Sequence, residues 1–101
     1  MTESEASLAF SALGHAGART VLRALNACAP GGLAPQELIA DLGLSSETVF
    51  SSLDRLAKAR FIVFDEPLWR ADPAGLISLQ SYLLDLKVAH EITSEAPTAA
   101  E

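Results

Sequence analysis

Apolar residues recur every three or four positions along most of the chain, the spacing that places them on one face of a helix. The pattern predicts a first helix over residues 5–13, ending near Gly14, and a second over residues 18–29, with a break near Gly17 between them. A third helix should begin at Pro35, whose missing amide costs nothing in a first helical turn, and end at Gly43.

The residues around Gly43 have the pattern of a helix-turn-helix, with an ordinary helical hairpin in a core as the alternative. Glycine adopts the left-handed backbone that such a turn requires at low cost, and Ser45 or Ser46 can cap the helix that follows. This geometry exposes the outer face of the second helix, which can then enter a DNA major groove. The apolar stripes of the two helices are Leu38, Ile39 and Leu42 before the turn, and Val49, Leu53 and Leu56 after it.

The second half of the chain is predicted to form a hairpin and a long helix. A β-prone run over residues 61–64 can pair with residues 68–71 across an acidic turn. Asp72 followed by Pro73 is a strong helix start, and the helix should run to about Glu91. It carries two apolar stripes, whereas a surface helix with one apolar neighbour needs only one. The second stripe therefore predicts contact with the same helix of another subunit.

Together these elements predict a mainly α fold with about five helices and a short two-stranded wing, in one domain over residues 5–91. Residues 92–101, rich in Ala, Glu, Thr and Pro, are expected to form a disordered acidic tail. A homodimer should form through the last helix, where the predicted interface residues are Leu76, Ile77, Leu83, Leu84 and Val88.

Composition limits these predictions without overturning them. The chain has 101 residues, enough for one modest core, and it has no apolar run that spans a membrane and no secretory signal pattern. We therefore expect a cytoplasmic protein without a membrane partner. The net charge of −6 opposes nucleic-acid binding, because Lys and Arg supply most of the non-specific binding energy. Most of the acidic excess, however, lies from Asp72 onward.

The outer face of the helix after the turn carries polar groups that can bind base edges or phosphates. A solvated helix face with an internal Asp54–Lys58 ion pair explains the same pattern equally well. Phe50 is interpreted as half-buried filler, with a thymine-methyl contact or a contact for a partner as alternatives. The predicted DNA-binding residues are Ser46, Glu47, Thr48, Phe50, Ser51, Ser52, Arg55 and Lys58.

The order of elements and several motifs resemble the ArsR/SmtB-type winged-helix repressors over residues 6–86. Ser-Ala-Leu-Gly-His at 11–15 with Val-Leu-Arg-Ala-Leu at 21–25 is similar to the opening of that family. Residues 35–44 are similar to its first helix-turn-helix helix, and Leu-Ser-Ser-Glu-Thr-Val at 44–49 begins a segment similar to its second. The resemblance implies a homodimer formed through the first and last helices, which adds Leu8 to the predicted interface. This dimer would bind an inverted-repeat operator in double-stranded DNA and repress transcription until a signal releases it.

Several residues depart from the family pattern. Asp54 stands where a basic residue is common, and Arg60 replaces the usual glycine before the wing. Asp65 and Glu66 occupy the wing tip, where basic residues would grip phosphate. These departures support an alternative function: an acidic winged-helix adaptor that binds a protein partner, such as a basic regulator, in place of DNA.

Metal binding and catalysis find little support. The chain has two histidines and one cysteine, so no cysteine pair can hold a metal, and we predict neither a metal nor a cofactor. It also lacks a glycine-rich phosphate loop and a nucleophile elbow, and we predict no enzymatic activity. Cys28 is interpreted as a small buried hydrophobe, with a single-thiol redox sensor as the alternative. His15 is expected to pack or hydrogen-bond at a helix junction.

Overall fold

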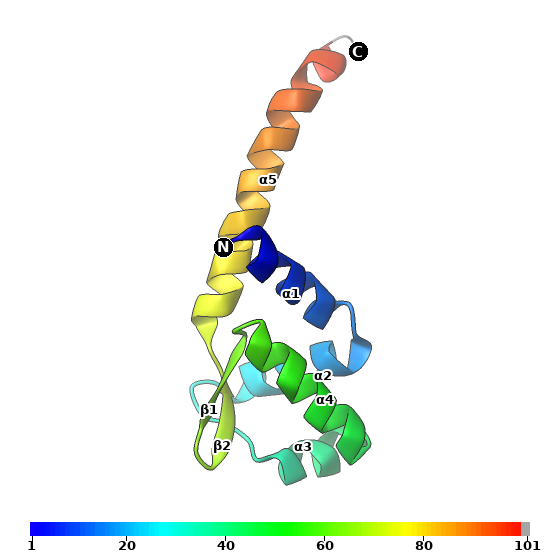
Figure 1. Ribbon diagram of the computed structural model, residues 1–101, viewed down its shortest axis with the longest axis vertical. Coiled ribbons are helices and arrows are strands. Elements are labelled where there is room, and N and C mark those ends of the chain that lie inside the picture. The colour runs from blue at the N-terminus through cyan, green and yellow to red at the C-terminus, as the bar shows by residue number, and fades with distance from the viewer. Residues whose placement is uncertain (100–101) are drawn as a thin grey trace.

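The computed structural model describes the backbone of residues 1–99 and the side chains of residues 1–86. Within this range the chain forms five helices and one two-stranded antiparallel sheet (Figure 1), which confirms the predicted mainly helical fold class. In chain order the elements are α1 (Glu3–Leu13), α2 (Ala16–Cys28), α3 (Pro35–Leu42), α4 (Ser46–Lys58), β1 (Ile62–Asp65), β2 (Leu68–Ala71) and α5 (Pro73–Ala99).

The first two helices begin two residues earlier than the apolar spacing predicts. Thr2 caps α1, because its hydroxyl accepts a hydrogen bond from the Glu5 amide at 3.1 Å while the Glu5 carboxylate accepts one from the Thr2 amide at 2.7 Å. The bond from the Thr2 backbone holds the pKa of Glu5 below its usual value. In α2 the helix starts at Ala16 and includes Gly17, so the break lies at Gly14 and His15 and not at Gly17.

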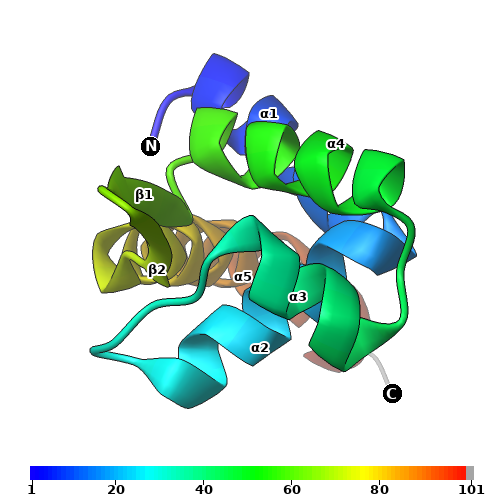
Figure 2. The same cartoon turned by 90° about the horizontal axis from the view of Figure 1, so that it is seen from below.

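The turn between α3 and α4 has the predicted geometry. Gly43 is left-handed, with φ 66° and ψ 21°, and its amide donates to the carbonyl oxygen of Ile39 at 3.2 Å. Ser45 is the cap of α4, since its hydroxyl accepts a hydrogen bond from the Thr48 amide at 3.1 Å. Figure 2 shows α3 and α4 joined at one end by this short turn.

The predicted hairpin follows α4. β1 pairs with β2 in a register that places Ile62 opposite Ala71. The β-prone run begins one residue earlier, at Phe61, but that side chain is fully buried and belongs to the core. Leu33, between α2 and α3, exchanges two backbone hydrogen bonds of 2.9 Å with Trp69 of β2. The hairpin is therefore attached to the loop between α2 and α3.

The core lies where α2 packs against α4, with α3 and the residue before β1 closing it. Gly17 sets the separation of α2 and α4: a Cβ there would lie 2.9 Å from Cγ2 of Thr48 and 3.2 Å from Oγ of Ser52. Glycine thus lets the first turn of α2 approach α4 closely. The largest fully buried side chains are Phe61, Leu25, Leu38, Leu53, Leu56, Val21 and Val49.

The last helix, α5, extends away from this body (Figure 1). Asp72 lies at its start, as predicted, and its carboxylate accepts a hydrogen bond from the Ala74 amide at 3.0 Å. Leu79 is buried against the body and Leu76 is half-buried. Tyr82 still contacts α1, but Leu83, Leu84 and Leu86, which follow it on the projecting helix, are exposed.

The far end of α5 differs from the prediction. We expected the helix to end near Glu91 and a disordered tail to follow, but the helix continues to Ala99. The alanines and glutamates of residues 91–99 favour a helix, whereas Pro97 opposes one because it has no amide to donate. Residues 100–101 and the side chain of Val88 lie outside the described residues. Within the described range no helix is long and apolar enough to cross a membrane.

Candidate nucleic-acid interface

The outward face of α4 carries most of the predicted DNA-binding residues and is open to solvent. The opposite side of α4 is buried in the core. Thr48 and Arg55 are half-buried along one edge of the outward face, beside the start of α2. The exposed residues of α4 are Ser46, Glu47, Phe50, Ser51, Asp54 and Lys58.

Two of these predictions need correction. Ser52 is only 4% exposed and its hydroxyl oxygen faces Gly17 of α2, so it cannot reach a base edge. The reason is its position on the helix, three residues after the buried Val49 and four before the buried Leu56. Phe50 is exposed over 52% of its surface and does not fill the core. It is available for contact with a nucleic acid or a protein.

Acidic residues lie close to several cations around α4 and the hairpin. The ion pairs are solvent-exposed, so each contributes little to stability. Each nevertheless reduces the positive charge that would attract a phosphate. The pairs are Lys58–Asp54 at 3.0 Å, as predicted, Arg70–Asp65 at 3.2 Å and Arg60–Glu5 at 3.9 Å.

Arg55 differs from these cations. Among the described side chains, no carboxylate lies within ion-pair distance of its guanidinium. Arg19 is also used within the protein, since it donates a hydrogen bond to the carbonyl oxygen of Leu13 at 2.6 Å. On α4, Arg55 is therefore the cation that can bind an external anion without first leaving an ion pair.

The tip of the hairpin presents acidic and aromatic side chains. The rings of Phe64 and Trp69 pack with their centroids 5.0 Å apart, and Phe64 remains 50% exposed. Asp65 and Glu66 are exposed beside them. Because the carboxylates repel a phosphate, this surface is not suited to binding the DNA backbone.

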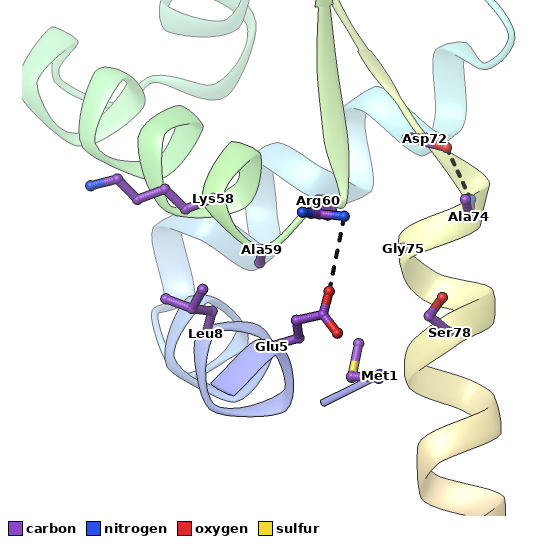
Figure 3. Close-up of a pocket in the computed structure, with 10 residues that line it drawn as sticks. All are labelled: Met1, Glu5, Leu8, Lys58, Ala59, Arg60, Asp72, Ala74, Gly75 and Ser78. Atoms are coloured by element: carbon purple, nitrogen blue, oxygen red, sulfur yellow. Dashed lines mark hydrogen bonds and ion pairs between the residues drawn. The ribbon is translucent and has the colours of Figure 1, made fainter. Parts of the chain in front are cut away.

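A cavity of about 400 Å³ lies where α1, the end of α4 and the start of α5 meet (Figure 3). Arg60 lines it in a left-handed conformation, with φ 65°, at the position where the resembled family has glycine. Its guanidinium extends to Glu5 of α1, so the side chain links α1 to the start of the hairpin. The lining mixes both signs of charge with apolar groups such as Leu8. It therefore indicates no particular ligand.

Both α1 and α5 expose large apolar side chains. The two helices touch through Phe10 and Tyr82, whose ring centroids are 6.1 Å apart. The Tyr82 hydroxyl donates a hydrogen bond to Glu3 at 3.0 Å, which raises the pKa of Tyr82. Of the predicted interface residues, Leu76 is half-buried and the others with described side chains are exposed. The exposed apolar residues of the two helices are Leu8, Phe10, Ile77, Leu83, Leu84 and Leu86.

The two residues considered for redox and junction roles lie at the ends of α2. Cys28 is exposed, and the prediction that it is buried is wrong, because it lies at the last position of α2, beyond the buried Leu25. His15 lies at the junction of α1 and α2, but its side chain makes no capping hydrogen bond. Among the described residues, no three His, Cys, Asp or Glu side chains gather to hold a metal ion.

Comparison of the chain with protein families, with curated proteins and with solved structures finds no match. The geometry of the surfaces described above therefore carries the functional argument.

Proposed function

We propose that the protein is a cytoplasmic, homodimeric DNA-binding transcriptional regulator, acting as a repressor without a metal or cofactor. In this proposal α3 and α4 form a helix-turn-helix and β1 and β2 form its wing. The observation that carries it is the outward face of α4. This face begins at a capped helix start directly after the left-handed Gly43 and is uncovered along its length. A helix presented in this way fits a major groove.

The side chains of that face can read bases. Ser51 and Thr48 carry hydroxyls that donate or accept, Glu47 can accept from a cytosine amino group, and Arg55 suits guanine or a phosphate. In a dimer the two α4 helices would occupy successive major grooves about 34 Å apart, so the operator would be an inverted repeat. Most cations near the outward face of α4 and the hairpin are already in ion pairs. The affinity for DNA should therefore decrease only slightly as the salt concentration rises.

The first prediction concerns base reading. Glu47→Ala combined with Ser51→Ala should lower affinity for the preferred site by about tenfold or more and leave non-specific binding nearly unchanged, because each good base contact discriminates by about 1–3 kcal/mol. Mobility shifts at low salt with DNA from the upstream region of its own gene would measure both affinities. The matched control is Gln36→Ala with Asp41→Ala, two exposed residues of α3. A folded wild-type dimer without any sequence preference would contradict the proposal.

A second function is favoured by a specific observation. The hairpin tip exposes Phe64 beside Asp65 and Glu66, and Lys58 is neutralised by Asp54. This arrangement supports an adaptor that uses an acidic and aromatic surface to bind a basic protein and block its DNA contacts.

The adaptor predicts a different result. Asp65→Lys with Glu66→Lys should abolish capture of a basic partner from lysate, because it reverses the charge of the hairpin tip. Both residues are exposed, so the fold should be retained. Gln36→Lys with Asp41→Lys on α3 is the matched control. If the hairpin variant instead binds DNA more tightly and captures the same proteins as the wild type, the adaptor is excluded.

A further inference from the structure

A polar cavity of about 420 Å³ lies where the first turns of α2 and α4 meet. It is lined at the start of α2 by His15 and Gly17, and along α4 by Thr48, Ser52 and Arg55. Gly17 forms part of the cavity wall where α2 lies so close to α4 that a Cβ would be 3.2 Å from Oγ of Ser52.

The start of α2 leaves backbone amides without partners. The first amides of a helix have no acceptor within it, and with the helix dipole they favour an anion. Side chains fill this role at other helices of the chain, Thr2 at α1 and Ser45 at α4. His15 does not fill it at α2. The free amides therefore remain available beside the cavity.

The hydroxyl of Ser52 is a second, independent sign of a ligand. Ser52 is only 4% exposed, and its Oγ points toward Gly17 at the cavity wall. Its hydroxyl makes no hydrogen bond with the described residues. Among those residues, every side-chain nitrogen or oxygen that is completely enclosed has a hydrogen-bond partner, so the Ser52 oxygen is not completely enclosed. The oxygen must therefore open into the cavity. Water can reach this oxygen through the cavity, and an anion bound there would accept a hydrogen bond from the hydroxyl in place of water.

Arg55 supplies a positive charge at the cavity edge, and Glu47 on the rim opposes it in part. The amides, the hydroxyl and the guanidinium are all donors, and together they match the oxygens of one phosphate. We propose that this cavity binds a phosphate of the DNA backbone, an inference that rests on the proposed DNA-binding function.

The position of the cavity on α4 indicates what a phosphate contact there would do. Glu47 and Ser51 of the outward face also line the cavity, so a phosphate held there lies beside the residues that would read bases. Phosphate contacts fix the register of a protein on the duplex, and base contacts specify the sequence. The cavity would therefore set how α4 enters the groove.

A carboxylate side chain can be introduced at the place that the phosphate is proposed to occupy. His15→Asp places a carboxylate at the start of α2, where it accepts hydrogen bonds from the free amides. We expect the Tm to rise by a few degrees while DNA affinity at low salt falls about tenfold. Because an added negative charge lowers DNA affinity by itself, the phosphate-binding role of the cavity is tested separately by the binding of inorganic phosphate. His15→Asn, the matched control, caps without a charge and should lower affinity less. Ser52→Ala should lower affinity about twofold without lowering the Tm.

Inorganic phosphate, titrated into the DNA-free dimer, separates this inference from the proposed function. It should shift the NMR amide signals of Ala16, Gly17 and Ala18 in the wild type and not in His15→Asp. Full DNA affinity in His15→Asp would overturn the inference and leave the proposed function standing. A wild-type protein that binds no DNA, yet shows these shifts, would make the cavity a site for a free anion and overturn both proposals. Absence of the shifts would likewise exclude a phosphate site.

Discussion

Phe61→Ala is expected to lower the free energy of unfolding by about 3–5 kcal/mol, the cost of removing a large aromatic side chain from a tightly packed core. Phe61 is fully buried and is the largest of the completely enclosed side chains. A domain of this size has a free energy of unfolding of about 5–15 kcal/mol, so the substitution would remove a large share of its total stability. Urea unfolding followed by circular dichroism would measure the change.

Two other phenylalanines provide the control. Phe50 and Phe64 are 52% and 50% exposed, so alanine at either position should change stability by less than about 1 kcal/mol. A similar loss in all three variants would show that Phe61 does not belong to the core. A loss confined to Phe61 would show that the residue before β1 helps to close the domain.

The elements around the turn were predictable because their signals are local. Gly43, Ser45 and Asp72 each act through a backbone conformation or a hydrogen bond within a few residues. Sequence alone contains all the information that such a signal needs. The same holds for the hairpin, where two β-prone runs flank a short turn.

The predictions that failed depend on contacts between distant segments. Gly17 has the pattern of a helix break, but its role is to let α2 approach α4, and a single sequence contains no sign of that approach. The burial of Ser52, in contrast, was open to prediction from its spacing, three residues after Val49 and four before Leu56; the side of α4 that carries it packs against Gly17 of α2. Cys28 is exposed because α2 extends beyond the core before it ends. The apolar spacing put the start of α2 at residue 18, so His15 was not recognised from sequence as the cap position that borders the cavity beside α2.

The apolar stripes of α5 were recognised from sequence, and the structure adds where they lose their cover. Leu79 is buried against the body, but Leu83 is 44% exposed and Leu84 is 53% exposed, farther along the projecting helix. Ile77 is also exposed, at 59%. A monomer would leave these side chains in water, as it would the exposed Leu8 of α1. A second copy of the chain offers the same apolar surface, as a twofold interface requires.

Leu83→Glu with Leu84→Glu should therefore convert the dimer into a monomer at micromolar concentration. Burying one leucine contributes about 1.5–3 kcal/mol, and the double change removes two such contributions from each subunit and adds charge to an apolar interface. Light scattering coupled to size-exclusion chromatography would give the mass. Gln80→Glu with Ser81→Glu adds the same charge at exposed polar positions of the same helix and should leave the dimer intact. A wild-type protein that is monomeric at this concentration would contradict both the dimer and the inverted-repeat operator, since the spacing of two α4 helices depends on their pairing.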